Sequence, residues 1–284
     1  MNANSPLLAP VIKSWLKSTS QQLETAGIAS ARLDAELILA HALQKERTYL
    51  HAHADDLLEL TVQQMADTQL ARRLKYVPIA YIVGYKEFYG RCFSVTTDTL
   101  IPRPESEDII NLLKRTLPST TYHLSPTTLR LIDVGTGSGC LGITAKLEFP
   151  ELKVTLTDIS PPALEVARTN AQRLHADVAL LESDLLQSYH LQADIIIANL
   201  PYVDSAWEVS PDTIHEPSIA LFADDGGLTL LRKLIDQAVS VLTPQGLLLL
   251  EADPRQHRLI IARASHQGFR LISKRDYCLA LKRT

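Results

Sequence analysis

The sequence predicts an α/β fold whose sheet is mainly parallel, with an antiparallel hairpin at its C-terminal edge and a small helical bundle near the N-terminus. From residue 129 onward, short strand-like runs alternate with helical runs, which is the pattern of a parallel sheet covered by helices on both faces. A glycine-rich stretch follows the first of these strands, where such sheets bind ligands. Before residue 76, apolar residues instead recur at helical spacing.

The N-terminal bundle is predicted to contain three helices. Pro10 precedes the apolar residues of the first helix, and Gly27 is placed to end it. Ser30 is a candidate N-cap for the second helix, and the capping-box sequence TVQQ at Thr61 opens the third. The first 75 residues hold eight basic and eight acidic side chains. We therefore expect an electrostatically neutral bundle that ends at Pro78.

The region after the bundle predicts a linker and then the α/β domain. Gly84 and Gly90 punctuate aromatic and β-branched residues, which indicates a hairpin linker, and Pro104 is a favourable first residue for the next helix. The strand-like runs beyond it are LRLIDV, KVTLTD, DVALLE, ADIIIAN and GLLLLEA, and FRLIS with YCLALKR form the edge hairpin. The predicted boundaries are residues 1–77 for the helical bundle, 78–103 for the hairpin linker and 104–284 for the α/β domain.

Composition narrows the class of protein. Of the 284 residues, 46% are apolar and 21% are charged, with a formal net charge of −4, so the chain can form a large core and has no basic footprint for nucleic acid. Its apolar runs are too short to span a bilayer, and the first 17 residues lack a secretory signal pattern. Cys92, Cys140 and Cys278 contain no CxxC pair, which is typical of reduced thiols. We expect a cytoplasmic protein without a metal site, and we interpret His51 and His53 as a solvated helix end.

The glycine-rich stretch DVGTGSGCLG, residues 133–142, has two competing interpretations. It lacks the GxxxxGK[ST] pattern of phosphate-binding NTPases, but Gly137, Gly139 and Gly142 satisfy the G-x-G-x-x-G pattern of nicotinamide enzymes. Asp133 favours a different ligand, because its carboxylate would repel a pyrophosphate. With this acid the stretch resembles motif I of the class I S-adenosylmethionine-dependent methyltransferases, D-x-G-x-G-x-G. The resemblance implies a Rossmann-like sheet in which the acid lies beside a cationic ligand.

Acidic residues also follow the next two predicted strands. Asp158 ends the second strand, where a carboxylate can accept both hydroxyl groups of a ribose. Asp184 follows the third strand, and the methyltransferase resemblance implies that it binds the adenine amino group while Leu185 packs against the ring. The implied cofactor is S-adenosyl-L-methionine, bound by Gly135, Thr136, Gly137, Ser138, Gly139, Asp158, Asp184, Leu185 and Asn199.

The fourth strand ends at Asn199, Leu200, Pro201 and Tyr202, which resemble the (N/D/S)-P-P-(Y/F/W) motif of methyltransferases that act on planar amino groups. The lone pair of such a nitrogen is delocalised, so the nitrogen is a poor nucleophile. The Asn199 side-chain oxygen and the Leu200 carbonyl can accept its two N–H bonds and aim it at a methyl group, while Tyr202 supplies an apolar wall. We predict that these four residues are catalytic and bind the substrate. Leu200 replaces the first proline of the motif but keeps the main-chain acceptor.

Four segments together resemble the HemK family of peptide chain release factor N5-glutamine methyltransferases. TLIPRPESE, GTGSG, NLPYV and HEPSIALFADDGGL occur in the family's order, and the resemblance covers nearly the whole chain. It implies methyl transfer to the side-chain amide nitrogen (N5) of the glutamine in the GGQ motif of release factors, with the bundle holding that protein substrate. Arg103 and Glu105 either border the site entrance or form a salt-bridged linker. We expect a monomer that contacts no nucleic acid directly and no membrane.

Four other functions remain open. A ribosomal-protein glutamine N5-methyltransferase would share the fold, cofactor and chemistry, although IPRPE favours the release-factor branch. An adenine-N6 methyltransferase of DNA or RNA would need a basic surface, which a neutral bundle does not provide. A nicotinamide-dependent oxidoreductase would leave Asp133 and the NLPY segment without a role. A non-catalytic cofactor-binding module would leave Asp158 and Asn199 unexplained.

Overall fold

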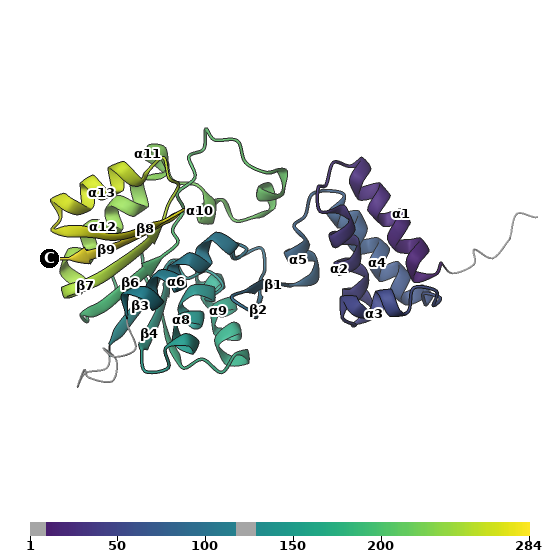
Figure 1. Cartoon of the computed structure of the whole chain (residues 1–284), viewed down its shortest axis with the longest axis horizontal. Coiled ribbons are helices and arrows are strands. Elements are labelled where there is room, and N and C mark those ends of the chain that lie inside the picture. The colour runs from purple at the N-terminus through teal and green to yellow at the C-terminus, as the bar shows by residue number, and fades with distance from the viewer. Residues whose placement is uncertain (1–9, 118–128) are drawn as a thin grey trace, which may run out of the picture. The chain divides into compact units, whose positions relative to one another are not determined.

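The computed structural model describes residues 10–117 and 129–284 and divides into two compact units. The first unit holds the chain up to Gly84 together with Ser210–His215, and the second holds Tyr85–Val209 and Glu216–Thr284. The first nine residues, on which part of the expectation about a secretory signal rests, lie outside the described residues. Figure 1 labels the elements of both units.

The first unit is built from short helices around two apolar clusters. Its helices are α1 (Ile12–Thr25), α2 (Ala31–Leu43), α3 (Arg47–Ala52), α4 (Leu60–Arg73) and α5 (Ile79–Val83). Helices α1, α2 and α4 confirm the three predicted helices. One cluster contains Trp15, Leu39 and Leu50 and the other contains Leu23, so each helix buries one apolar stripe.

Three local predictions in this unit need correction. Pro78 does not end the bundle, because it is the N-cap of α5, whose Ile82 packs in the bundle core. The Thr61 capping box is wrong, since α4 already begins at Leu60 and has no side-chain cap. Ser30 occupies the N-cap position of α2, but its hydroxyl donates to Asp34 Oδ2 at 2.9 Å and caps no backbone N–H.

The segment Ser210–His215, which follows the NLPY segment in the sequence, also belongs to the first unit. The buried guanidinium of Arg73 donates to Asp34 at 2.6 Å and to Asp212 at 3.1 Å. His215 hydrogen-bonds to the carbonyl of Lys75 at 2.9 Å. The chain therefore leaves the second unit soon after the NLPY segment, pairs with the bundle, and returns at Glu216.

The second unit contains a seven-stranded sheet in the order β5-β4-β3-β6-β7-β9-β8. Its strands are β3 (Arg130–Val134), β4 (Lys153–Asp158), β5 (Val178–Glu182), β6 (Ala193–Ala198), β7 (Leu242–Glu251), β8 (Phe269–Arg275) and β9 (Cys278–Arg283). Neighbours from β5 to β7 pair in parallel, whereas β9 is antiparallel to both β7 and β8. The predicted α/β class and the antiparallel C-terminal edge are both confirmed.

Helices cover both faces of this sheet (Figure 1). The helices of this unit are α6 (Glu107–Thr116), α8 (Cys140–Glu148), α9 (Pro161–Arg173), α10 (Ser218–Leu221), α11 (Asp224–Gly227), α12 (Thr229–Val241) and α13 (His257–His266). A hairpin of β1 (Tyr85–Phe88) and β2 (Arg91–Ser94) precedes them. The hairpin confirms the predicted strand pair of the linker.

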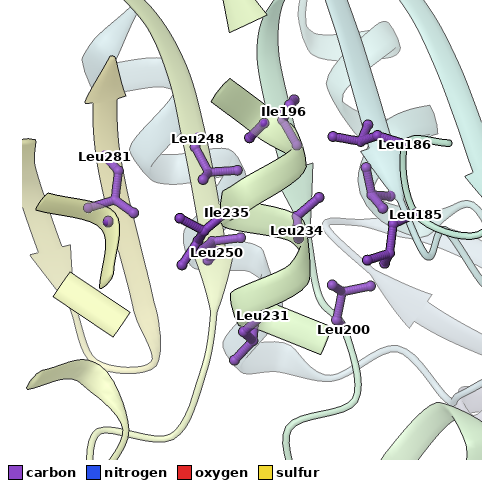
Figure 2. Close-up of a cluster of buried hydrophobic side chains, with 14 of the residues drawn as sticks. Leu185, Leu186, Ile196, Leu200, Leu231, Leu234, Ile235, Leu248, Leu250 and Leu281 are labelled. Atoms are coloured by element: carbon purple, nitrogen blue, oxygen red, sulfur yellow. The ribbon is translucent and has the colours of Figure 1, made fainter. Parts of the chain in front are cut away.

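Alternate residues of the central strands enter two separate cores. On β6, Ile196 and Ala198 pack with α12, as Figure 2 shows for Ile196, while Ile195 and Ile197 pack with α6 and α8. A strand buried on both faces is apolar throughout. This explains why the run IIIA continues without polar interruption up to Asn199.

The described residues contain no helix long and apolar enough to cross a membrane. In the same part of the chain, no group of three or more His, Cys, Asp or Glu side chains is placed to hold a metal ion. His53 instead stacks on Tyr49, with ring centroids 3.9 Å apart, and lies 2.9 Å from Asp56. The three cysteines are free thiols: Cys92 is exposed, Cys140 half-buried and Cys278 buried.

Candidate active site

A cavity lies at the carboxyl ends of β3, β4, β5 and β6, where parallel sheets bind ligands. It receives predicted site residues from four successive strand ends. They are Gly135, Gly137, Asp158, Asp184, Leu185, Asn199, Leu200 and Pro201. The fold therefore brings together segments that lie far apart in the sequence.

The glycine loop after β3 is shaped by positive backbone angles. Gly135 has φ +69° and Gly137 has φ +54°, a region that favours glycine over other residues. A β-carbon on Gly135 would lie 2.7 Å from the Leu200 side chain, whereas one on Gly137 would meet no atom within 4 Å. Position 135 thus sets how closely the loop approaches the NLPY segment.

Asp133 organises this loop from within the core. Its Oδ2 atom accepts the Thr136 hydroxyl at 2.6 Å and the Gly142 N–H at 2.8 Å, so it ties the loop to the first turn of α8. Its Oδ1 atom is buried and has no hydrogen-bond partner among the described residues. Burial raises the pKa of Asp133 to about 6, although the two hydrogen bonds oppose the shift.

Asp158 connects the end of β4 to the same loop. Its carboxylate accepts the Gly137 N–H and the Ser160 N–H, each at 2.9 Å. Burial raises its pKa, and these backbone hydrogen bonds oppose the shift. A carboxylate has about four acceptor sites, so Asp158 keeps acceptor capacity for a ligand in the cavity.

Asp184 and Leu185 follow β5. Asp184 forms an ion pair with Lys233 at 2.6 Å and accepts a bond from Gln187 at 3.1 Å. Leu185 has φ +55°, and its side chain joins the cluster beside α12 that Figure 2 shows. Both residues border the cavity, and the Asp184 carboxylate is already paired with Lys233.

The NLPY segment places an amide and an aromatic ring directly after β6. The Asn199 amide nitrogen donates to the Ser106 hydroxyl at 2.8 Å. Leu200 is almost fully buried, and Figure 2 shows its side chain beside Leu185. The Tyr202 hydroxyl donates to Glu251 Oε1 at 3.0 Å. Burial raises the Tyr202 pKa, and the nearby Glu251 charge adds to the shift, so the ring stays a neutral phenol.

Four of the predicted site residues do not line the cavity. They are Thr136, Ser138, Gly139 and Tyr202. Thr136 and Ser138 are buried, and Thr136 instead supports Asp133. The pattern D-x-G-x-G-x-G identifies the loop as a unit, but it does not separate residues that face a ligand from those that support the turn.

Other cavity-lining residues were missed by the sequence reasoning. They are Asp98, Thr99, Leu100, Ile159, Ser160, Ala163, Ser183, Ile219, Ala220 and Leu230. Two groups carried a usable signal, because Thr99 and Leu100 begin the TLIPRPESE segment and Ile219 and Ala220 lie in HEPSIALFADDGGL. The remainder are ordinary neighbours of strand ends, without a distinguishing residue type.

An ion pair joins the TLIPRPESE and HEPSIALFADDGGL segments. Arg103 of IPRPE contacts buried Glu216 of the HEPSIALF segment at 2.5 Å. The second Glu216 oxygen accepts the Ile101 N–H at 3.2 Å. Of the two interpretations of Arg103, the structure therefore shows the salt bridge. Glu105 is exposed.

Comparison with known proteins assigns the chain to a family. Residues 14–84 match the model of the PrmC N-terminal domain, and residues 110–274 match that of the methyltransferase small domain. A release factor glutamine methyltransferase of Koribacter versatilis is 39% identical over 258 residues, covering 86% of this chain and 88% of the relative. The chain belongs to the release factor glutamine methyltransferase family. The Coxiella burnetii family member is 36% identical, and 96% of each chain is covered.

This family member also resembles solved methyltransferase structures. One is the T. thermophilus 16S rRNA methyltransferase RsmC in complex with AdoMet and guanosine, with a TM-score of 0.51 and 14% identity. The match covers 70% of this chain and 50% of the RsmC chain. At this identity the similarity establishes the fold alone, and it agrees with the predicted class I methyltransferase sheet.

Proposed function

We propose that this protein transfers a methyl group from S-adenosyl-L-methionine to the side-chain amide nitrogen of the glutamine in the GGQ motif of peptide chain release factors. The product is N5-methylglutamine. The observation that carries the proposal is Asn199, held at the end of β6 beside a cavity that the glycine loop also lines. Family membership supports the substrate. Because one chain holds all the site residues, we propose a monomer, and we also propose that it is cytoplasmic.

The residues around the cavity fit S-adenosyl-L-methionine. Asp133 keeps one buried carboxylate oxygen without a partner among the described residues, which suits a ligand that carries positive charge. Asp158 retains acceptor sites for the ribose hydroxyls, and Asp184 and Leu185 border the region proposed for adenine. The bound cofactor supplies an electrophilic methyl group.

Asn199 and Leu200 orient the amide that is methylated. The Asn199 Oδ1 atom and the Leu200 carbonyl each accept one N–H of the substrate amide, and Pro201 restricts the backbone that carries them. These acceptors also stabilise the positive charge that develops on the nitrogen. Tyr202 packs beside the planar group. No acid–base pair is needed to start the transfer, because alignment of the nitrogen with the methyl carbon supplies much of the acceleration. As the nitrogen–carbon bond formed, the carbon–sulfur bond would break to leave S-adenosyl-L-homocysteine, and the methylated nitrogen would release one proton to water.

The decisive experiment for this function compares substrates. Labelled S-adenosyl-L-methionine is offered with a release factor, with ribosomal proteins and with DNA, and mass spectrometry locates the added methyl group. We expect one methyl group on the GGQ glutamine. Methylation of a ribosomal-protein glutamine would favour the sister activity, and methylation of adenine would reject protein as the substrate.

The helical bundle, predicted as residues 1–77, is proposed to hold the release factor. It has its own apolar cores and presents the exposed apolar side chains Leu57 and Leu60. Deleting it would also remove the partners of Ser210–His215, so substitutions give the clearer test. Leu57→Ser with Leu60→Ser should raise KM for the release factor several-fold with kcat unchanged, because remote docking contacts are lost. Leu259→Ser, at an exposed position on α13, is the control. An unchanged KM would reject this role.

A further inference from the structure

A buried carboxylate lies behind the NLPY segment and has no part in the chemistry described above. Glu251 ends β7 and is 1% exposed. In the parallel pairing of β6 and β7, Ala198 is opposite Leu250, so Asn199 and Glu251 each follow a paired residue. The sheet therefore places this acid next to the proposed substrate-binding residues.

Two buried side chains, Ser106 and Glu251, hold the NLPY segment. In the first contact, the Asn199 amide nitrogen donates to Ser106 Oγ at 2.8 Å. In the second, the Tyr202 hydroxyl donates to Glu251 Oε1 at 3.0 Å. The Oε2 atom has no partner at direct hydrogen-bond distance in the described part of the chain. Ser106 is itself 1% exposed, so water does not compete for its hydroxyl.

The contact with Ser106 orients the Asn199 amide. Ser106 Oγ accepts this hydrogen bond, so the nitrogen end of the amide points at Ser106. The opposite end of the amide, Oδ1, is then free to face the substrate. Without this bias, a rotated amide would direct N–H groups at the N–H groups of a glutamine, and the two would repel.

We propose that Ser106 and Glu251 are positioning residues that fix the orientation of the Asn199 amide and the Tyr202 ring for methyl transfer. The inference rests on the proposed function. It adds a requirement for two residues that touch neither the cofactor nor the glutamine. Their effect is to keep Asn199 as an acceptor and Tyr202 as a fixed wall.

The test uses a pair of variants at position 106 that are matched in shape. Ser106→Thr and Ser106→Val add similar bulk, but only threonine keeps the hydroxyl. We expect Ser106→Thr to retain most of the wild-type kcat. Ser106→Val should lower kcat about 10- to 100-fold, less than the loss of a direct transition-state contact, with calorimetric affinity for S-adenosyl-L-methionine unchanged. Thr144→Val is the control. It removes a buried hydroxyl that has no hydrogen-bond partner among the described residues, and it should leave kcat unchanged.

A double variant tests whether Ser106 acts through Asn199. In the Asn199→Ala background, Ser106→Val should cause no further loss, because the amide that it orients is absent. Glu251→Gln should also lower kcat, since it replaces the carboxylate that accepts the Tyr202 hydroxyl with an amide that can turn an N–H toward it. If Glu251→Gln does not fold, the matched variants at position 106 decide.

The outcomes separate this inference from the proposed function. A wild-type protein that methylates no release factor would reject the function itself. If the wild type is active, equal kcat for Ser106→Thr and Ser106→Val would overturn the positioning role. Multiplicative losses in the double variant would also overturn it, because Ser106 would then act independently of Asn199.

Discussion

Gly227 lies directly against the main-chain carbonyl of Tyr202. A β-carbon at position 227 would overlap that carbonyl oxygen, and Gln256 donates to the same oxygen at 2.8 Å. Gln256 also donates to the Gly226 carbonyl at 2.7 Å. The glycine pair of the HEPSIALFADDGGL motif therefore packs against the NLPY segment, directly through Gly227 and through Gln256 for Gly226. This contact explains the two glycines of the motif in structural terms.

The first prediction compares the two glycines of this pair. Gly226 has φ +65° and Gly227 has φ +78°, so alanine introduces similar backbone strain at either position. Only Gly227→Ala would displace the Tyr202 carbonyl, since the nearest atom to a β-carbon at 226 is Asp204 Oδ2 at 3.8 Å. We expect Gly227→Ala to lower kcat on the order of 10²-fold, the scale for misplacing a reacting group by about 1 Å. Equal kcat values for the two variants, measured with a release factor, would contradict this.

The second prediction concerns Asn199. Asn199→Ala removes one preorganised acceptor and should lower kcat on the order of 10²–10³-fold. Asn199→Asp keeps an acceptor but loses the N–H that Ser106 accepts and adds a negative charge. It should therefore bind the cofactor and still methylate poorly. Full activity of Asn199→Ala in a mass-spectrometric assay would refute the proposed role of the amide.

The third prediction addresses Asp158 by calorimetry. Asp158→Ala removes the proposed ribose contacts and also the anchor of the Gly137 N–H, so affinity for S-adenosyl-L-methionine should fall by roughly 1.5–3 kcal/mol. Asp158→Asn, which keeps one acceptor oxygen, should fall by less. NAD serves as the control ligand and should not bind to the wild type. Tight binding of NAD in place of S-adenosyl-L-methionine would show that the glycine loop belongs to a nicotinamide-binding site.

Much of the fold and part of the site could be predicted from the sequence, because their signals are local. Strands β6 and β7 contain continuous apolar runs, and Asn199 to Tyr202 follow β6 without interruption. Ser106 and Glu251 gave no comparable signal. A serine before a helix and a glutamate at a strand end are common. The pairing of β6 with β7 brings Glu251 near Asn199, and the packing of the segment before α6 brings Ser106 to the Asn199 amide.

The parts that the sequence did not predict depend on long-range contacts or on short elements. Helix α5 has five residues, which is too few to show helical periodicity. Asp212 looks like any exposed loop acid, and its pairing with Arg73 joins positions that are 139 residues apart. Thr136 and Asp184 were predicted to bind the cofactor from their places in the glycine loop and after a strand end. Their partners in the structure, Asp133 and Lys233, follow from packing and have no local signal in the sequence.

The fourth prediction is a pH dependence of stability that arises from Asp133. Its pKa is raised from 3.8 to about 6 by burial, so between about pH 4 and 6 the folded cofactor-free protein binds more protons than the unfolded chain. The free energy of unfolding therefore falls as the pH rises through this window and stays lower above it. Asp133→Asn cannot ionise and keeps an acceptor for Thr136 and Gly142. Urea unfolding of this variant should show a flatter pH profile and a gain on the order of 1–3 kcal/mol at pH 7.

The control for this prediction is Asp177→Asn, because Asp177 is exposed. It should reproduce the wild-type profile across the same range. A steep fall between pH 4 and 6 that persists in Asp133→Asn would assign the proton uptake to another group.

The last prediction separates the two functions of Leu200, whose side chain fills a core while its carbonyl is proposed to bind the substrate. The side chain is 3% exposed and packs in the cluster that Figure 2 shows. Leu200→Ala keeps the carbonyl but leaves a cavity, so the free energy of unfolding should fall by about 2–5 kcal/mol. Leu200→Pro fills more of that space, stiffens the loop and restores the motif's proline, so it should lose less stability than alanine and retain kcat. Chemical denaturation and single-turnover methylation measure the two effects separately. If Leu200→Pro folds like the wild type but loses methyl transfer, the assignment of the position 200 carbonyl as an acceptor is wrong.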